Sequence, residues 1–280
     1  MAKRKPVFLL VVGDYEALLP HLPYRGVKKA LFRAYVAFEE WALRQMTSRV
    51  LTFTNGAALR RKHEHDGGRI IETKTTTLGA GDIGTRTDVA ASGAIKALTV
   101  SRIDPRKGLR ALPGAIAELV ADGIDVSLDI IGPTIGLIGD SERDAIADEA
   151  RQRGVAERVR LVGAVPLDQL MAKYREYDVF ILPTQPGEGI PRVLLEAMAN
   201  GLPVVTTDVS GITSLVVNGG NGLLIPDASS TSVAGAVKRL ARDGDLRRRL
   251  IQGGYRTARA HTLEHQAAEM MKAAGYWRPA

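Results

Sequence analysis

From residue 94 onward, short apolar segments alternate with longer amphipathic ones, and this alternation limits the possible folds more than any other feature. The apolar segments have the length of strands. They cover residues 94–100, 126–131, 159–162, 179–182, 202–207 and 223–225. The predicted helices cover residues 108–122, 141–153, 167–174, 191–200, 231–242 and 245–260. Because short connections join these elements, we expect an α/β fold in which a parallel sheet is covered by helices on both faces.

The residues before 94 predict a smaller and incomplete α/β unit. Its predicted strands, helices and extended segment cover residues 6–12, 24–45, 49–54, 57–63 and 69–77. A segment rich in Gly, Asp and Thr then follows as a linker, and residues 264–274 predict a last helix. A chain of 280 residues is long enough for two domains. We therefore expect four parts, at residues 1–77, 78–92, 93–262 and 263–280.

Composition excludes several classes of protein. The chain has no cysteine, so disulfides, thiol catalysis and thiolate metal sites are excluded. The apolar run at residues 7–12 is far shorter than the roughly 20 residues of a membrane span. The first 70 residues hold 13 Lys and Arg against 6 Asp and Glu, so the whole net charge of +7 lies there. Such a region favours anionic partners, but few aromatics accompany the charges, which argues against single-stranded nucleic acid.

Residues 186–205 carry the clearest candidate for a binding site. Pro191 suits the first position of a helix, and Gly201 suits the left-handed position just past its end. Glu188 precedes this helix and Glu196 lies inside it. The free amides at a helix N-terminus can hold a phosphate, and the glycines on either side of Glu188 let a ligand approach the backbone closely.

Two cationic side chains follow the first strand of the regular region. Arg102 and Lys107 lie between the strand at 94–100 and the next helix, and Gly132 follows the strand at 126–131. The carboxyl ends of parallel strands meet at one edge of the sheet, where ligands bind in such folds. Cationic side chains beside a helix N-terminus are suited to a diphosphate. The sequence therefore predicts a nucleoside diphosphate site that brings these residues together with Glu188 and Glu196.

Two other motifs favour structural interpretations. Residues 79–84 match the dinucleotide pattern G-x-G-x-x-G, but no apolar strand precedes them and no helix follows. His63, Glu64, His65 and Asp66 contain possible metal ligands, but the segment is polar and no further ligand cluster is near in sequence. We interpret the first as a linker and the second as a solvated turn.

Residues from about 90 to 262 resemble the C-terminal domain of the family 4 glycosyltransferases, which have the GT-B fold. The resemblance rests on four segments, VSRIDPRKGL at 100–109, VRLVG at 159–163, YDVFILP at 177–183 and EGIPRVLLEAMANGLPVV at 188–205. The two glutamates separated by seven residues, Glu188 and Glu196, are the hallmark of that family. The resemblance implies a Rossmann-like sheet and a donor-binding domain at residues 93–262.

The resemblance also implies roles for individual residues. Arg102 and Lys107 would bind the donor diphosphate, Glu196 the ribose hydroxyls and Glu188 the donor sugar. We place Gly132, Gly189 and Ile190 in the same donor site, and we name Glu188, Arg102 and Lys107 as the catalytic set. The family retains anomeric configuration and usually needs no metal ion, so we expect no metal and no cofactor beyond a UDP-sugar or GDP-sugar donor.

The N-terminal part departs from the family pattern. Residues 1–77 resemble only the last part of an acceptor-side domain, and Gly13 and Asp14 stand where many relatives carry a histidine. We expect a retaining glycosyltransferase of the cytoplasm, with peripheral contact at the inner face of an anionic membrane, a glycan or lipid-linked acceptor and no nucleic acid partner. The alternatives are an inactive nucleotide-sugar-binding remnant and a nucleotide-sugar epimerase. We also expect the last helix to pack against the helix at 24–45.

Overall fold

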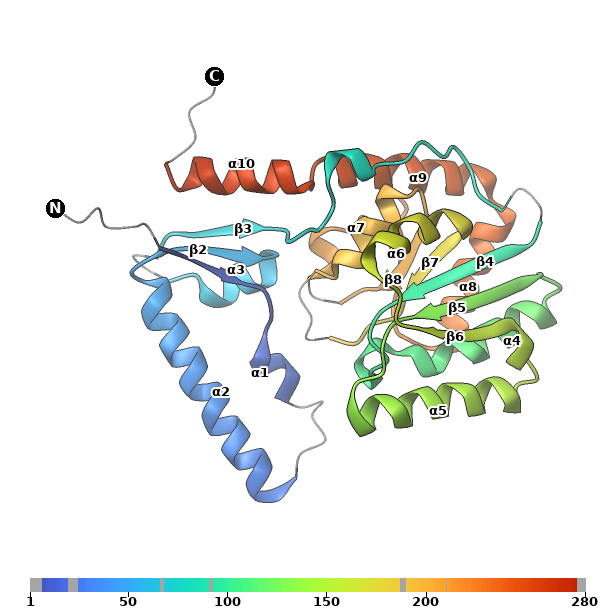
Figure 1. The fold of residues 1–280 in the computed structure, drawn as a ribbon, viewed down its shortest axis with the longest axis horizontal. Coiled ribbons are helices and arrows are strands. Elements are labelled where there is room, and N and C mark those ends of the chain that lie inside the picture. Colours follow the sequence, from blue (N-terminus) through green and yellow to red (C-terminus); the bar gives the residue numbers. More distant parts are fainter. Residues whose placement is uncertain are drawn as a thin grey trace.

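The structure, a computed structural model, describes residues 7–19, 25–65, 68–90, 93–186, 190–209 and 211–275. It has a larger domain built on a six-stranded sheet and a smaller N-terminal part built on a three-stranded sheet, as Figure 1 shows. Every strand pairing within the two sheets is parallel. The prediction of an α/β fold with parallel sheets is therefore confirmed.

The larger sheet follows the predicted alternation closely. Its strands are β4 (Ile95–Val100), β5 (Val126–Ile131), β6 (Val159–Gly163), β7 (Val179–Leu182), β8 (Val204–Thr207) and β9 (Leu223–Ile225). They lie in the order β6-β5-β4-β7-β8-β9. From β4 the chain first adds strands towards one edge and then returns to add β7, β8 and β9 towards the other. Neighbouring strands β4 and β7 therefore mark the point where the winding of the sheet reverses.

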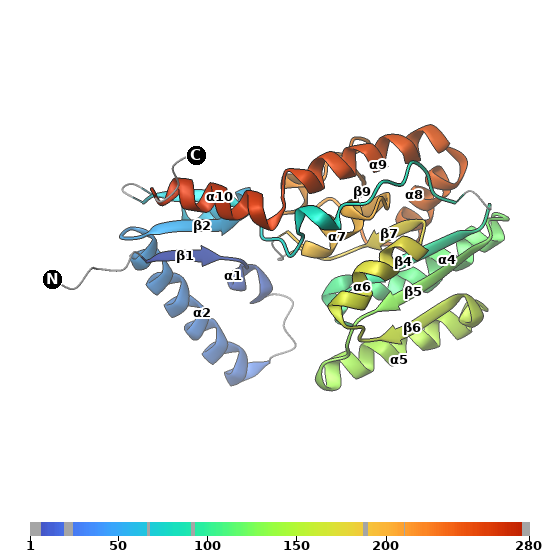
Figure 2. The same cartoon turned by 45° about the horizontal axis from the view of Figure 1, so that its top comes forward.

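Helices cover both faces of this sheet (Figures 1 and 2). One face packs on α4 (Leu112–Ala121), α5 (Gly136–Gln152) and α8 (Ser230–Arg242). The other packs on α6 (Leu167–Lys173), α7 (Arg192–Ala199) and α9 (Gly244–Arg259). The strands carry apolar side chains towards both faces, because each face has its own buried core. Burial on both faces explains why these strands read as continuous apolar runs.

Two predicted helix starts differ from those observed. The helix predicted from residue 108 is preceded by two single 3₁₀ turns, Pro105–Lys107 and Leu109–Ala111, and α4 begins only at Leu112. Helix α5 begins at Gly136, five residues before the predicted start at 141. Its N-cap, Ile135, makes no side-chain hydrogen bond, and Leu137 and Ile138 in its first turn are exposed. A search for polar caps and buried apolar residues therefore misses this first turn.

The N-terminal part is a small parallel sheet with its own helices. Its strands β1 (Phe8–Val11), β2 (Leu51–Asn55) and β3 (Ile70–Thr73) lie in the order β1-β2-β3. Its helices are α1 (Tyr15–Leu18), α2 (Gly26–Thr47) and α3 (Ala57–His63), of which α1 is absent from the prediction. Within the described residues β1 pairs only with β2, so its other edge is open.

The last helix, α10 (Leu263–Ala273), returns to the N-terminal part. Gln266 Nε2 donates a hydrogen bond to Thr73 Oγ1 on β3 at 3.4 Å, and Glu264 accepts one from the backbone N–H of Ala80 at 3.2 Å. Figure 1 shows α10 beside β3, and Figures 1 and 2 both show α2 on the other side of the small sheet from it. The predicted packing of this helix against the helix at 24–45 is therefore wrong. Among the described helices, none is both long and apolar enough to cross a lipid bilayer.

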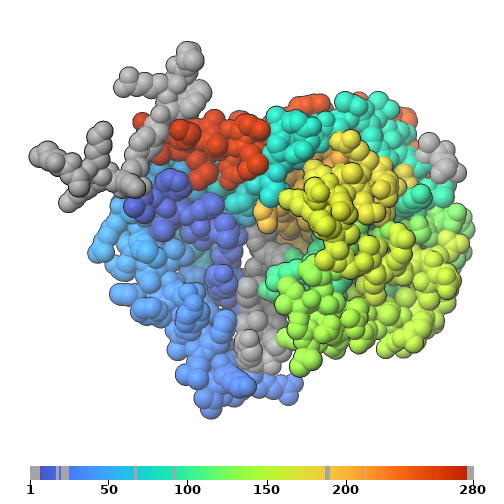
Figure 3. Space-filling model, in the orientation of Figure 1, coloured from blue at the N-terminus to red at the C-terminus, as the bar shows by residue number. Residues whose placement is uncertain are grey.

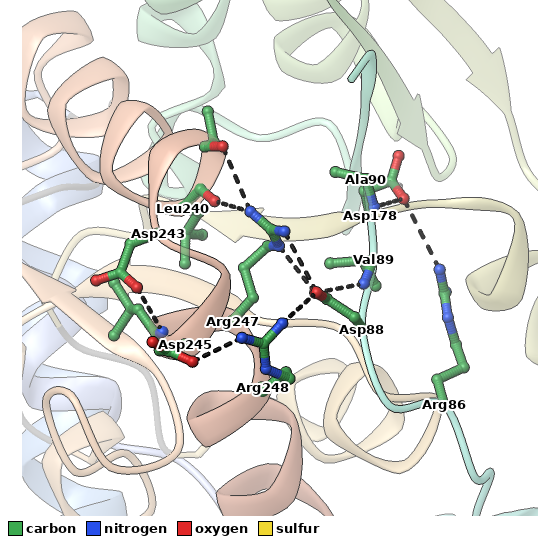
Figure 4. A network of polar contacts seen from close by, with 12 residues as sticks. Arg86, Asp88, Val89, Ala90, Asp178, Leu240, Asp243, Asp245, Arg247 and Arg248 are labelled. Atoms are coloured by element: carbon green, nitrogen blue, oxygen red, sulfur yellow. Dashed lines mark hydrogen bonds and ion pairs between the residues drawn. The ribbon is translucent and has the colours of Figure 1, made fainter. Parts of the chain in front are cut away.

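The connector between the two parts is fastened to the larger domain by charged side chains (Figure 4). Asp88 accepts hydrogen bonds from Arg247 at 2.9 Å and Arg248 at 3.1 Å, both on α9. Asp178 accepts one from the backbone N–H of Ala90 at 2.7 Å. Burial favours the neutral form of Asp88, but the hydrogen bonds from Arg247 and the Val89 N–H, together with the charges of Arg247 and Arg248, hold the pKa of this carboxyl below its ordinary value. Residues 74–90, which follow β3 and include most of the segment expected to be a linker, thus form a fixed strap.

Candidate functional site

The reversal of winding between β4 and β7 locates the candidate site. In an open parallel sheet the loops that leave two such neighbouring strands diverge to opposite faces, and a crevice opens between them. The loop after β4 carries Arg102 and Lys107, and the loop after β7 leads to α7 and Glu196. The strand order therefore brings together residues that lie about a third of the chain apart.

A cavity of about 910 Å³ lies at this edge, between the larger domain and the N-terminal part. The larger domain contributes Ser101, Arg102, Arg106, Lys107, Ile190 and Glu196. The N-terminal part and the strap contribute Gly13, Asp14, Tyr15, Asn55, Thr75 and Thr76. In Figure 3 the N-terminal part, in blue, lies on one side of the molecule, and the green and yellow segments of the larger domain lie on the other. Gln266 of α10 also reaches the cavity, so the wall is built by all three segments.

The cationic side of the cavity is shaped by the turn after β4. Arg102 is exposed, whereas Lys107 is buried, with 8% of its surface exposed. Gly108 after them has φ +66°, and a Cβ there would lie 2.1 Å from the carbonyl oxygen of Pro183. Only glycine fits this position, because the backbone of the β4 loop touches that of the β7 loop. The contact fixes where Lys107 stands relative to the start of α7.

A third cation, Arg106, also lines the cavity and was not selected from the sequence. Its guanidinium binds Asp104 through Nε at 2.9 Å and Nη2 at 2.6 Å. The hydrogen bonds from Arg106 hold the pKa of the Asp104 carboxyl below its ordinary value. Asp104 also accepts from the backbone N–H of Arg106, and so caps the 3₁₀ turn that carries Lys107. The pair therefore stiffens the cationic loop.

Glu196 lies on α7 with 5% of its surface exposed. Both carboxylate oxygens are hydrogen-bonded: Oε1 accepts from Thr77 Oγ1 at 2.8 Å and Oε2 from the Tyr174 hydroxyl at 2.9 Å. Burial and the nearby charge of Glu196 raise the pKa of Tyr174 well above its ordinary value. Tyr174 therefore stays protonated and acts as the donor of that bond. Sequence reasoning found Glu196 but neither of its two partners.

The other predicted site residues have different outcomes. Ile190 lines the cavity, and its carbonyl oxygen accepts a hydrogen bond from Asn55. Glu188 and Gly189 lie outside the described residues. Gly132 does not lie among the described residues that line the cavity. Its φ is +149°, and a Cβ there would lie 1.8 Å from the carbonyl oxygen of Ser101, so the structure places it in close packing beneath the β4 loop.

Asp14 places a carboxylate on the N-terminal wall of the cavity. Asp14 Oδ1 accepts a hydrogen bond from Lys62 Nζ at 2.5 Å, and Glu40 binds the same ammonium group at 2.8 Å. Burial favours neutral Lys62, but the hydrogen bonds to these carboxylates keep its pKa above the ordinary value. The acidic wall faces the cationic loop across the cavity. No sequence signal predicts this, because Lys62 and Asp14 lie 48 positions apart.

The two motifs interpreted as structural lie away from this cavity. Within residues 79–84, Ala80–Asp82 forms a 3₁₀ turn closed by a bond from the Gly79 N–H to the Asp82 carboxylate. His63 is buried at the end of α3, and His65 Nε2 pairs with Thr47 Oγ1 at 2.9 Å. Across the part of the chain that the structure describes, no group of three or more His, Asp and Glu side chains is placed to hold a metal ion.

The fold and this cleft together define an α/β protein of the GT-B class, in which the larger domain presents an edge that carries Arg102, Arg106 and Lys107 to the smaller N-terminal part. The sequence profile of the glycosyl transferases group 1 matches residues 87–257, which is more than half of the chain. The chain belongs to that family, as the resemblance in residues 90–262 predicts. The matched range includes Arg102, Lys107 and Glu196.

Curated relatives resemble the larger domain. The D-inositol 3-phosphate glycosyltransferase of Jonesia denitrificans is 35% identical over 175 residues, which cover 61% of this chain and 40% of the relative. The phosphatidyl-myo-inositol mannosyltransferase of Mycobacterium leprae is 31% identical over 169 residues, covering 60% of this chain and 43% of the relative. The match thus spans less than half the length of these relatives.

A solved structure resembles nearly the whole chain. HepE of Anabaena, determined in complex with UDP, superposes with a TM-score of 0.76 at 18% identity. The superposition covers 98% of this chain and 73% of HepE. The likeness extends through the N-terminal part, so the small sheet, the larger domain and the returning helix follow the same GT-B fold.

Proposed function

We propose that the chain forms the donor-binding side of a retaining glycosyltransferase that moves a sugar from a nucleoside diphosphate-sugar to an acceptor hydroxyl. This proposal rests on one observation. Arg102, Lys107 and Glu196 line the same cavity, at the edge where the winding of the sheet reverses between β4 and β7. Two cations suit a diphosphate, and a carboxylate suits the hydroxyls of a ribose. Family membership and the UDP bound by HepE support the same assignment.

The proposed reaction needs charge stabilisation at the leaving group. The bond between the anomeric carbon and the diphosphate oxygen breaks, and a bond from that carbon to the acceptor oxygen forms on the same face. The acceptor proton passes to the leaving phosphate oxygen, so no protein base is required. Negative charge grows on the diphosphate as the bond breaks, and Arg102 and Lys107 stabilise it from fixed positions. Glu188 orients the donor sugar in this proposal and is not a nucleophile.

The direct test compares a nucleoside diphosphate with its nucleoside. Among the groups of the proposed ligand, Lys107 would bind the phosphates, so calorimetry of Lys107→Ala should show about tenfold weaker UDP or GDP binding and unchanged nucleoside binding. The matched control is Lys173→Ala, because this lysine lies on α6 and does not line the cavity. Equal losses for both ligands would remove Lys107 from the phosphate site.

Turnover separates this proposal from its alternatives. The transferase requires an acceptor to consume the donor, and it releases the nucleoside diphosphate. An epimerase changes the sugar of the donor without any acceptor, and a binding remnant does neither. The names of the relatives point to acceptors that carry inositol, so inositol phosphates and lipid-linked glycans are the first acceptors to assay. The UDP-sugars and GDP-sugars are the donors to test.

We also propose that α2 contacts an anionic membrane surface at the cytoplasmic face. Five apolar side chains form one stripe along this helix at spacings of three and four, and each is more than half exposed: Val27, Leu31, Tyr35, Phe38 and Trp41. Lys28 lies beside the stripe, and Lys29 and Arg33 lie on the polar side of the same end of the helix. Basic residues beside an exposed apolar face with Tyr and Trp are the features of helices that lie in a lipid interface.

Vesicle sedimentation tests this contact. The chain should bind vesicles rich in phosphatidylglycerol and not those of phosphatidylcholine alone, with binding reduced by Lys28→Glu with Lys29→Glu. Arg239→Glu with Arg242→Glu on α8 gives the same change in net charge on the other domain and should leave binding intact. Loss of binding in both double variants would show that overall charge, and not α2, attracts the membrane.

A further inference from the structure

The carboxylate of Glu196 is held by two hydroxyl groups from residues that do not line the cavity. One hydroxyl donates to each of its oxygens, Thr77 to Oε1 and Tyr174 to Oε2. Glu196 lines the cavity, whereas neither Thr77 nor Tyr174 does. A carboxylate oxygen can accept two hydrogen bonds, so each oxygen keeps one acceptor position. Because the two oxygens belong to one carboxylate, the remaining positions are close enough together to accept from two neighbouring hydroxyls of one ligand.

Tyr174 is held in place by the core of the larger domain. It has no exposed surface, and its ring contacts Phe180 of β7 at a centroid distance of 6.0 Å. Within the described part of the chain, its hydroxyl donates to the Glu196 carboxylate. The bond therefore fixes the rotation of that carboxylate, because a buried ring cannot follow a side chain that turns away.

Thr77 comes from a different segment, the strap that links the two parts of the molecule. Its neighbours on both sides are buried, and Leu78 has no exposed surface and packs in the core that also holds Tyr174. The carbonyl oxygen of Leu78 accepts a hydrogen bond from the Leu263 N–H at the start of α10 at 2.7 Å. The position of the Thr77 hydroxyl is thus set by the strap and the returning helix together.

We infer that Thr77 and Tyr174 are positioning residues that hold the Glu196 carboxylate for a cis-diol, the 2′ and 3′ hydroxyls of the donor ribose. This inference rests on the proposed nucleoside diphosphate site and adds its sugar selectivity. A ribonucleotide fills both free acceptor positions, and a 2′-deoxynucleotide leaves one empty. Because Thr77 lies on the strap, the preference for ribose depends on the docking of the strap and not on the larger domain alone.

The test measures a preference instead of an affinity. Calorimetry gives the dissociation constants of UDP, 2′-deoxy-UDP, GDP and 2′-deoxy-GDP. The variants are then compared with the ribonucleotide and deoxynucleotide of the base that binds more tightly. The full chain should bind the ribonucleotide about tenfold more tightly than its deoxy form, as expected for one hydrogen bond to a charged group. Thr77→Val and Tyr174→Phe should each reduce this preference to about threefold or less, while Thr77→Ser should restore it.

Two controls separate positioning from stability. Thr99→Val removes a buried hydroxyl that donates to the Ile181 carbonyl oxygen, and Tyr177→Phe removes one that donates to the Asp129 carboxylate. Both should keep the full preference, because neither hydroxyl contacts Glu196. A variant that only loosens the fold lowers the affinities of both nucleotides together and leaves their ratio unchanged.

The outcomes are distinct. If Thr77→Val and Tyr174→Phe bind with the full ribose preference, the inference is overturned and the proposed function stands. If the unaltered chain binds nucleoside diphosphates with no ribose preference, the assignment of Glu196 to a diol is overturned. If it binds neither UDP nor GDP, the proposed function itself fails, and this inference fails with it.

Discussion

Glu196 is the residue on which the nucleotide assignment depends most, and its surroundings allow a clean substitution. Glu196→Gln keeps the shape of the side chain and removes the charge. The Thr77 and Tyr174 hydroxyls can each turn from donating to accepting, so the amide NH₂ can still be satisfied inside the protein. We expect a loss of about 1–3 kcal/mol in nucleotide binding, measured by calorimetry, with a small change in melting temperature. A large fall in melting temperature with unchanged affinity would identify a structural residue.

At the scale of single residues, the sequence predicted the cavity-lining residues that come after strands. It did not predict the residues that hydrogen-bond to them. Arg102, Lys107 and Glu196 could be found because chain order places loops at the carboxyl edge of a parallel sheet. The partners of Glu196 lie 119 and 22 positions from it. Such hydrogen bonds depend on how the strap and the helices dock, which no local pattern encodes.

Among the elements, the strap gives the clearest prediction about stability, at the end that carries Asp88. Asp88→Asn removes the charge that Arg247 and Arg248 bind, and we expect a loss of about 1–3 kcal/mol near neutral pH. The folded-state pKa of Asp88 is lowered, so its contribution is present above the ordinary value of 3.8 and is lost as pH falls through the lower folded value.

Urea unfolding across pH 3–7 measures this contribution. The difference in free energy of unfolding between the natural chain and Asp88→Asn should be constant near neutral pH and shrink below about pH 4. Asp245→Asn is a suitable control, since Asp245 binds the exposed side of Arg248 but does not touch the strap. A difference that persists unchanged at the lowest pH would show that the charge of Asp88 does not fasten the strap.

Element types were predictable and their docking was not. Strands β5, β7 and β9 match the predicted ranges, because apolar runs between turn residues define a strand buried on both faces. Helix α10 was expected at almost its observed range, yet its neighbour is β3 and not α2. The helix has no buried residue, so its sequence carries no apolar face that would indicate where it docks.

On the scale of the whole molecule, the smaller part leaves apolar surface exposed. Strand β1 has a free edge within the described residues, and Phe8 and Leu10 on it are 48% and 43% exposed. The superposition on HepE leaves 27% of that chain without a counterpart here, by subtraction from the 73% covered. An open apolar strand edge is a site at which chains associate. A cavity whose smaller wall is a three-stranded sheet among the described residues also excludes water poorly, which weakens transfer.

We therefore predict that this 280-residue chain binds donor nucleotide, transfers sugar weakly and self-associates. Light scattering should show a mass that rises with concentration, and Phe8→Lys should reduce that rise because charge on an edge strand opposes pairing. Leu167→Lys introduces the same charge at an exposed leucine of α6 and should not reduce it. Transfer is assayed on the same samples with UDP-sugars and GDP-sugars. A stable monomer that transfers sugar efficiently would show that the three-stranded part is a sufficient acceptor wall.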